Sequence, residues 1–395
     1  MPDISTSAPA FEFTVEVAIV GGGACGLTAA LAASDEGAQV LVLERDDSAL
    51  GSTAMSTGLI PAAGTPEQRD RDIPDSPQVF LEDILRKTKG QTDEAMARRI
   101  AEESADTVGW LREQHAAPLE LIDGFLYPGH THKRMYGTPN RTGAELQGAL
   151  EAALGRTGAD LLTGHRVETL YVEDDRVVGL RAIRGDGAIE DIGCGALILA
   201  CCGFGANTDM VRAYIPEIAD ATYFGHPGNT GDAVSWGAGL GAAMADMAGY
   251  QGHGGLAVGH GVPILWPLIM EGGIQVNAEG VRFSNEAEGY SEQAAKVNAQ
   301  PGRIAWSIFD ERLHELMMAF DDYRDALRAG AVVSASDVAA LAVATGLPAD
   351  QLAETLVTVE ACVGGQLQDT FGRDFRGKPP LTPPYRAAKV TGALF

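Results

Sequence analysis

The chain has 395 residues and carries 29 Lys and Arg against 54 Asp and Glu, which gives a formal net charge of −25 at pH 7. A protein that binds DNA or RNA needs a basic surface to displace the counterions of the phosphates. No Lys/Arg-rich run offsets the acidity here, so the composition argues against a nucleic-acid partner and against an anionic membrane surface.

Hydrophobicity and cysteine usage indicate the compartment in which the protein is expected. No run approaches the ~18 continuous apolar residues of a membrane helix, so we expect no membrane insertion. The five cysteines are scattered and include no CxxC pair, which is typical of free thiols in a reducing compartment. Residues 1–13 lack the basic and apolar regions of a signal peptide and are predicted to form a loose tail. A cytoplasmic protein is expected.

A βαβ unit is predicted directly after this tail. Residues 15–20 form a continuous apolar run that ends in three glycines, as a buried parallel strand does. Residues 24–36 are small and helical in character, and residues 39–44 (QVLVLE) form a second apolar run. The chain therefore opens with the parallel-strand motif of α/β proteins.

The following segments predict helices and then a β-meander. Apolar spacing predicts a helix over 93–114, with a buried face made of Met96, Ile100, Val108 and Leu111. Thr142 is expected to cap the next helix. Short alternating runs near 166–173, 176–183 and 188–194 predict the meander, and residues 196–200 (ALILA) a further buried strand.

From about residue 251 the chain changes character, because Gly/Pro-rich segments alternate with short strands. Helices are predicted at 310–329, 335–345 and 350–363. We interpret this part as an inserted second domain, with the PPLTPPY stretch (379–385) as the linker out of it.

The first strand runs into a dinucleotide-binding signature. Gly21, Gly23 and Gly26 form GxGxxG between the strand and the helix, where a pyrophosphate would lie on the helix N-terminus. Glu44 closes the second strand, where its carboxylate could accept hydrogen bonds from ribose hydroxyls. Both FAD and NAD use this turn. The hydroxyl-rich segment GSTAMSTG (51–58) and a second strand running into glycines, LILACCGFGAN (197–207), favour FAD.

Together these motifs resemble the fumarate reductase/succinate dehydrogenase flavoprotein superfamily, which includes the 3-ketosteroid dehydrogenases. GNTGDA (228–233), NAEGVRFSNE (277–286), DTFGRDF (369–375) and PPYRAAKVTGALF also match. The resemblance implies an α/β fold, in which a Rossmann-like FAD-binding domain with a parallel sheet and a β-meander is interrupted by an α+β capping domain. The expected boundaries are 1–250 for the FAD domain, 251–384 for the cap and 385–395 for a return strand of the FAD domain. In the family a further FAD-contacting segment follows VTGALF, so we expect this chain to lack it.

The resemblance implies FAD as a non-covalent cofactor, because GSTAMSTG lacks the histidine of covalently flavinylated members. The expected FAD-binding residues are Gly21, Gly23, Gly26, Glu44, Arg45, Gly51, Ser52, Thr53, Ser56, Gly58, Val167, Ala200, Cys201, Gly203 and Asp232.

Three residues are the expected catalytic groups. Tyr290 lies eight residues past Arg282, where fumarate reductases carry a proton-donating arginine, and its NExxxY context resembles the ketosteroid dehydrogenases. His253 resembles a substrate-binding histidine, although the Glu and Arg of the fumarate reductase relay would fall at Trp266 and Ile269. Arg134, in the basic segment 128–143, could hold a carboxylate or carbonyl, or belong to a solvated loop.

The leading hypothesis is an FAD enzyme that desaturates or reduces a C–C bond next to a carbonyl, as ketosteroid dehydrogenases do, with Tyr290 as acid or base. The alternative is fumarate reductase-like reduction of an unsaturated carboxylate. A hypothesis of another class is a non-catalytic flavin-binding or cofactor-free remnant. The expected partners are a small-molecule substrate and an electron acceptor whose class the sequence leaves open, as it does the oligomeric state.

Overall fold

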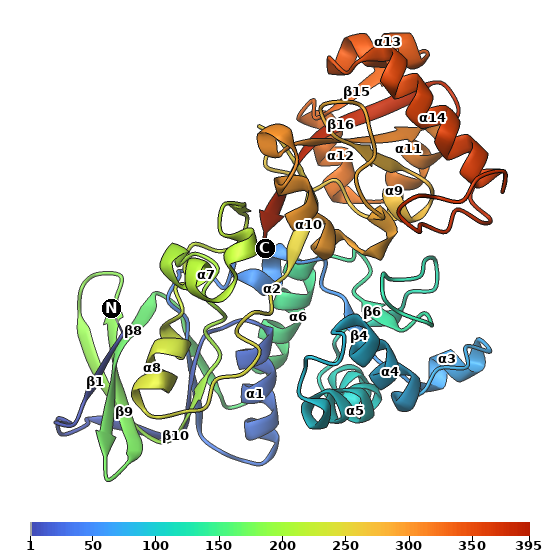
Figure 1. The fold of residues 1–395 in the computed structure, drawn as a ribbon. Coiled ribbons are helices and arrows are strands. Elements are labelled where there is room, and N and C mark those ends of the chain that lie inside the picture. Colours follow the sequence, from blue (N-terminus) through green and yellow to red (C-terminus); the bar gives the residue numbers. More distant parts are fainter. Residues whose placement is uncertain (1) are drawn as a thin grey trace. The chain divides into compact units, whose positions relative to one another are not determined.

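The structure is a computed structural model that describes residues 2–395 (Figure 1). The chain folds into two compact units. Unit 1 comprises residues up to Met210 together with Gly225–Met247. Unit 2 comprises Val211–Phe224 and Ala248–Phe395.

Unit 1 is built on a seven-stranded sheet with the order β1-β8-β9-β10-β2-β3-β7. The strands are β1 (Asp3–Ser5), β2 (Phe13–Val20), β3 (Val40–Leu43), β7 (Asp160–Leu162), β8 (His165–Glu173), β9 (Arg176–Arg184) and β10 (Ile189–Leu199). β10, β2, β3 and β7 are parallel neighbours, whereas β8, β9 and β10 form the antiparallel meander. Successive residues of β3 pack alternately into the hydrophobic clusters on the two faces, which explains the uninterrupted apolar run.

The meander differs from the sequence prediction in one respect. Residues 189–199 form one strand rather than two, because β10 pairs antiparallel with β9 through Ile189–Gly193 and parallel with β2 through Ile192–Leu199. A single long strand therefore joins the meander to the parallel sheet.

The N-terminal segment is also not a loose tail. β1 adds a parallel strand beside β8, with Asp3 opposite Thr169. The ring of Phe11 lies where side chains at Gly179 and Gly193 would otherwise project, and it contacts Tyr171. These contacts fasten residues 3–13 to the sheet.

The helices of unit 1 are α1 (Ala24–Asp35), α2 (Ser52–Met55), α3 (Pro66–Asp70), α4 (Pro77–Lys87), α5 (Glu94–Glu113), α6 (Gly143–Leu154), the start of α7 (Thr208–Tyr214) and α8 (Asp232–Gly239). Thr142 caps α6 as predicted, since its hydroxyl accepts a hydrogen bond from the amide of Glu145. α5 lies where it was predicted, but Met96 and Ile100 are exposed, because the buried face is the row of Ala97, Ala101, Ser104, Val108 and Leu111. A small sheet in the order β4-β6-β5 completes the unit: β4 (Ile60–Pro61), β5 (Glu120–Leu121) and β6 (Met135–Gly137).

Unit 2 is organised around β16 (Tyr385–Leu394), which pairs with β14 (Ala305–Asp310), β12 (Gly252–Ala257), β15 (Val332–Ala335) and β11 (Thr222–Tyr223). β13 (Ile274–Val276) pairs with β14. The helices are α9 (Pro267–Met270), α10 (Tyr290–Asn298), α11 (Glu311–Met317), α12 (Asp321–Arg328), α13 (Val338–Thr345) and α14 (Ala349–Val363).

Two expectations about unit 2 meet different outcomes. The helices predicted at 310–329, 335–345 and 350–363 are present as α11 to α14. The expected return of residues 385–395 to the first domain is wrong for this structure, because β16 is hydrogen-bonded along its length within the sheet of unit 2. Among residues 2–395, no helix is long and apolar enough to span a membrane.

Candidate functional site

A cavity of about 350 Å³ opens in unit 1 at the carboxyl ends of parallel strands β2, β3 and β10. This is the edge at which ligands bind to open α/β sheets. The first residues of α1 also line the cavity, so the positive end of the helix dipole faces it. The lining residues include Gly21, Gly23, Ala24, Cys25, Glu44, Arg45, Asp46, Gly51, Ser52, Thr53, Arg166, Val167, Ala200, Cys201, Cys202, His226, Gly228, Asn229, Asp232 and Trp236.

The glycine turn is shaped by close backbone contacts. A Cβ on Gly21 would lie 2.5 Å from the carbonyl oxygen of Ala200, and its φ of +112° also favours glycine. A Cβ on Gly26 would lie 1.9 Å from the carbonyl oxygen of Gly21. No side chain fits at either position, so the turn stays narrow enough for a pyrophosphate to reach its backbone.

The backbone of Gly22 is held by two side chains, one bonded to its N–H and the other to its carbonyl. Its N–H donates to Oε2 of Glu44 at 2.8 Å, and its carbonyl accepts from Nε2 of Gln147 in α6 at 2.8 Å. The other carboxylate oxygen of Glu44 accepts from the amide of Asp46 at 3.0 Å. Glu44 is therefore oriented by two backbone amides and can still accept hydrogen bonds from ribose hydroxyls through its remaining lone pairs.

The segment after β3 closes over the start of α1. Oγ1 of Thr53 accepts a hydrogen bond from the amide of Ala24 at 2.9 Å. Oγ of Ser52 lies 3.3 Å from Sγ of Cys202 and accepts from Nδ2 of Asn229 at 3.1 Å. α2 is thus tied to α1, to the end of β10 and to the loop before α8.

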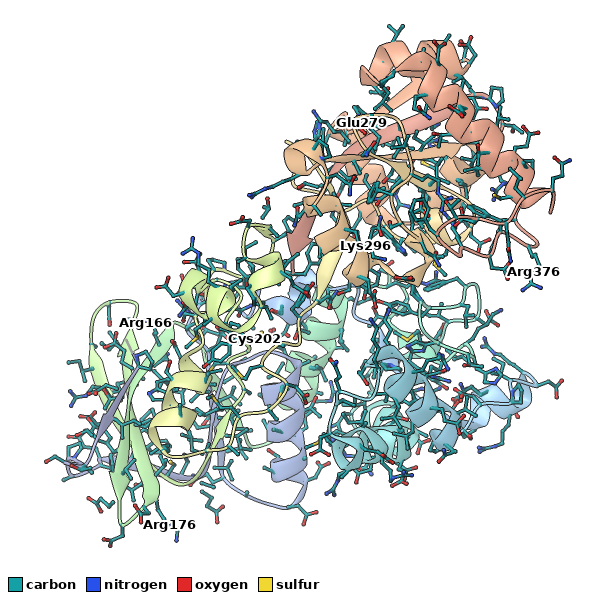
Figure 2. All side chains as sticks on the ribbon, in the orientation of Figure 1. Arg166, Arg176, Cys202, Glu279, Lys296 and Arg376 are labelled. Carbon is teal, nitrogen blue, oxygen red and sulfur yellow. The ribbon has the colours of Figure 1, made fainter. Side chains whose placement is uncertain are left out.

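The end of β10 forms another part of the cavity wall. Burial, with a contribution from the nearby carboxylate of Asp232, raises the pKa of the Cys201 thiol to about 11, so this side chain is a neutral, apolar wall at pH 7. Cys202, labelled in Figure 2, is exposed and has a φ of 63°. Asp232 begins α8 and accepts from the hydroxyl of Thr230 at 2.9 Å.

A second cavity, also of about 350 Å³, adjoins the first and shares Arg45, Arg166, Val167 and Asp232 with it. Arg45 donates to the carbonyl of Gly228 at 2.9 Å. Because Glu44 is the predicted ribose-binding residue, the adenine of a bound dinucleotide is expected on the side of Arg45 and Val167, away from α1.

The structure gathers most of the predicted FAD residues around this cavity. In the described part of the chain, four of the predicted residues lie behind the walls of the cavity and do not line it: Gly26, Ser56, Gly58 and Gly203. Oγ of Ser56 donates to the carbonyl of Thr53, Gly58 passes close to the carbonyl of Thr142, and the carbonyl of Gly203 accepts from the amide of Gly231. The narrow glycine turn and the oriented carboxylate fit an FAD, and the individual contacts remain predictions.

Several lining residues were missed by sequence reasoning. The ring of His226 is fixed by Gly228, whose amide donates to Nδ1, and by Asp46, whose Oδ2 lies 2.9 Å from Nε2. His226 lies two residues before the GNTGDA motif, which was the available signal. Trp236, one helical turn beyond Asp232, lines the cavity, is 1% exposed and packs into the hydrophobic cluster of the sheet.

His253 and Tyr290 lie together in unit 2 in an aromatic cluster. The ring of His253 stacks on Phe395 at 5.0 Å and on Tyr290 at 5.4 Å between centroids, and it meets Trp266 edge-on at 5.8 Å. Burial lowers the pKa of His253 to about 4, so the ring is neutral at pH 7. Its Nδ1 accepts from the amide of Gly255 at 3.0 Å, so the proton of the neutral ring resides on Nε2.

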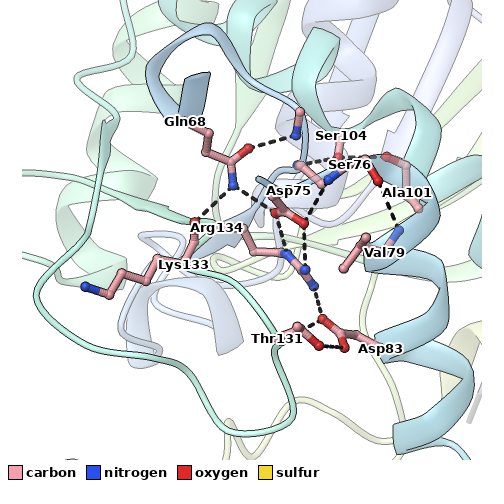
Figure 3. Close-up of polar contacts among 12 residues, drawn as sticks. Gln68, Asp75, Ser76, Val79, Asp83, Ala101, Ser104, Thr131, Lys133 and Arg134 are labelled. Carbon is pink, nitrogen blue, oxygen red and sulfur yellow. Dashed lines mark hydrogen bonds and ion pairs between the residues drawn. The ribbon is translucent and has the colours of Figure 1, made fainter. Parts of the chain in front are cut away.

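Arg134 does not have the role predicted for it. It is fully buried, and its guanidinium donates to both carboxylate oxygens of Asp75 and, through Nη1, to Asp83 at 2.7 Å (Figure 3). It also packs over the ring of Phe80. The structure therefore gives Arg134 a structural role in place of substrate binding, because its charge is neutralised by two partners distant in sequence.

The fold and site define a dinucleotide-binding flavoprotein scaffold. Residues 16–394 match the family model described as the FAD binding domain, and the chain belongs to this family. This confirms the predicted superfamily, the fold class and FAD as the cofactor, whose binding the cavity in unit 1 fits.

The chain is 30% identical over 386 residues to the probable fumarate reductase Ifc3 of Shewanella frigidimarina, an alignment that covers 96% of this chain and 64% of that protein. It is 28% identical over 377 residues to the NADH:fumarate oxidoreductase of Klebsiella pneumoniae, covering 95% of this chain and 40% of that protein. The chain thus spans less than two thirds of the length of these curated relatives.

The solved structures agree in fold. The open conformation of a flavocytochrome c3 fumarate reductase superposes with a TM-score of 0.80 at 29% identity, covering 98% of this chain and 68% of that chain. A 3-ketosteroid-Δ4-(5α)-dehydrogenase from Rhodococcus jostii RHA1 superposes with a TM-score of 0.77 at 23% identity, covering 100% and 87%, which shows a shared fold.

Proposed function

We propose that the chain is an FAD-dependent oxidoreductase that acts on a carbon–carbon bond next to a carbonyl group, on a substrate of low polarity. Bound FAD supplies hydride chemistry in such enzymes. The observation that supports this proposal is the set of aromatic rings around a neutral His253 in unit 2.

His253 is suited to hold a carbonyl oxygen. Because Nδ1 is occupied by the amide of Gly255, the ring can offer only its Nε2–H, a neutral donor. A neutral donor among aromatic rings suits an uncharged carbonyl, since a carboxylate there would be desolvated without a compensating cation.

The arginines of the NAEGVRFSNE and DTFGRDF motifs in unit 2, Arg282 and Arg373, are paired with a buried carboxylate. Glu286 is 1% exposed, and it accepts from Nη2 of Arg282 at 2.8 Å and from Nη1 of Arg373 at 3.1 Å. Burial favours a raised pKa for Glu286, but the two guanidinium groups outweigh it and hold the pKa below its usual value. Both cations are thus committed to structural ion pairs, and the relay positions of the fumarate reductases hold the apolar Trp266 and Ile269.

Tyr290 is the candidate proton donor or acceptor. It begins α10 directly after Gly289, whose φ of 143° suits glycine, and its ring stacks on His253. A phenol on this cluster would exchange the proton at the carbon adjacent to the one that exchanges hydride.

Fumarate reductase-like reduction of an unsaturated carboxylate is the second candidate. The names of the curated relatives favour it, since the two first matches are a probable fumarate reductase and an NADH:fumarate oxidoreductase. In that case, His253 would donate to a carboxylate oxygen.

The test compares substrates on the flavin of the purified protein. The proposal expects α,β-unsaturated ketones to reoxidise dithionite-reduced protein, or saturated ketones to bleach oxidised protein, faster than fumarate or succinate. Tyr290→Phe should bind FAD normally and slow flavin turnover by substrate at least ~100-fold. An unchanged rate removes Tyr290 from the mechanism, faster turnover of fumarate favours the second candidate, and a protein that stays colourless with added FAD rejects both.

A further inference from the structure

The N-terminal strand β1 contacts two elements that line the cofactor cavity. It pairs with β8, which supplies Arg166 and Val167 to the cavity. It also contacts α8, which supplies Asp232 and Trp236 to the cavity.

The contacts between β1 and α8 are specific. The indole Nε1 of Trp236 donates to the carbonyl of Asp3 at 3.0 Å. Cδ1 of Ile4 lies 2.6 Å from where a Cβ on Gly239 would be, so α8 approaches the strand closely only because Gly239 has no side chain. Ile4 packs into the same hydrophobic cluster as Leu170 of β8 and Trp236.

The chain start also reaches the cofactor side. Pro2 lines the second cavity together with Arg45, Arg166 and Asp232. This is the end of the site beyond Glu44, where the adenine of FAD is expected. β1 therefore bridges the Val167 wall and the Asp232 wall at the adenine end.

We propose that β1 is a positioning element of the FAD site, which fixes the distance between β8 and α8 and thereby sets the affinity for the adenylate half of FAD. Without it, α8 loses a hydrogen-bond acceptor for Trp236 and the apolar partner Ile4. Asp232 and Trp236 would then have to be ordered when FAD binds, and this ordering weakens binding.

The experiment compares the FAD and ADP affinities of the unchanged chain with those of three variants. Removal of residues 2–6 should weaken both ligands by the same factor, roughly 10-fold or more, read by flavin fluorescence for FAD and by calorimetry for ADP. Ile4→Ala and Trp236→Phe should each weaken both roughly 3- to 10-fold.

Val177→Ala is the matched control, because Val177 packs on the same cluster but lines neither cavity. It should lower the unfolding midpoint about as much as Ile4→Ala and leave both affinities unchanged. If the shortened chain does not fold, Ile4→Ala decides the question, because Ile4 lines neither cavity whereas Trp236 lines the first.

Unchanged FAD affinity in the folded variants would overturn the proposal, as would equal losses in Val177→Ala. A loss for FAD but not for ADP would also overturn it, because the effect would not lie at the adenine end. The inference rests on the FAD site and not on the proposed reaction. Since its readout is binding, a failure to turn over any ketone leaves it standing.

Discussion

Replacing Arg134 with methionine should destabilise unit 1 and leave the binding of substrate intact. Methionine keeps much of the apolar volume over Phe80 but removes the charge and all three hydrogen bonds to Asp75 and Asp83. The side chain of Asp75 has no exposed surface, so its carboxylate would remain buried without its cation. Breaking a buried ion pair in this way costs about 3–5 kcal/mol of unfolding free energy.

The loss should fall mainly on Asp75, because Asp83 keeps the cation of Arg86. The partners that remain to Asp75, Nε2 of Gln68 and the amide of Ser76, are uncharged. Burial favours a raised pKa for Asp83, but hydrogen bonds from Thr131, Arg86 and Arg134 outweigh it and hold the pKa at about 2. The stabilisation from Asp83 is therefore full above its usual pKa of 3.8 and is lost as the pH falls towards 2. The double variant Arg134→Met with Asp75→Asn removes the orphaned charge and should recover a substantial part of the loss.

Urea unfolding with excess FAD measures the effect. Arg86→Met is the matched control, since the side chain of Arg86 is 58% exposed in its pair with Asp83 and its loss should cost less than about 1 kcal/mol. A stable Arg134→Met protein with weakened substrate binding would refute this reasoning and restore the anion-binding role predicted from the sequence.

Two further predictions concern buried polar groups. Gln147→Leu leaves the carbonyl of Gly22 without its donor and should weaken FAD binding roughly 10-fold, measured by flavin fluorescence; an unchanged affinity would show that Glu44 alone holds the turn. His253 has a pKa lowered to about 4 by burial, so the unfolded chain binds a proton there between pH 6.5 and 4 that the folded chain does not. Stability should therefore fall by up to about 3 kcal/mol as the pH drops from 7 to 4. His253→Gln should lack this part of the loss in urea titrations, and parallel pH curves for the two proteins would contradict the assignment.

The parts of the fold that were predicted correctly depend on local patterns. The βαβ unit and the cap at Thr142 require only residues close in sequence, and the structure has both. The glycine turn and Glu44 were also visible, because a strand, a turn and a second strand fix their positions within about 30 residues.

What the sequence could not predict depends on distant partners. Arg134 lies in the most basic segment, and its neutralisation by Asp75 and Asp83 exists only once α4 packs beside the small sheet. Met96 and Ile100 are apolar at helical spacing, yet small residues one position further along α5 form the packed face, since helices approach closely there. The N-terminal strand β1 was missed, and a loose tail was predicted in its place, because a three-residue strand carries almost no periodic signal.

The cofactor loop shows how these distant contacts create a binding site. Glu44, Thr53 and Gln147, from three separate segments, bond to the backbone of Gly22 and Ala24. These bonds hold the turn and the start of α1 in one conformation, so the entropy cost of ordering them is met when unit 1 folds and not when FAD binds. An acidic chain can therefore bind a pyrophosphate with few cations at the site, because pre-oriented amides at a helix N-terminus supply the positive potential.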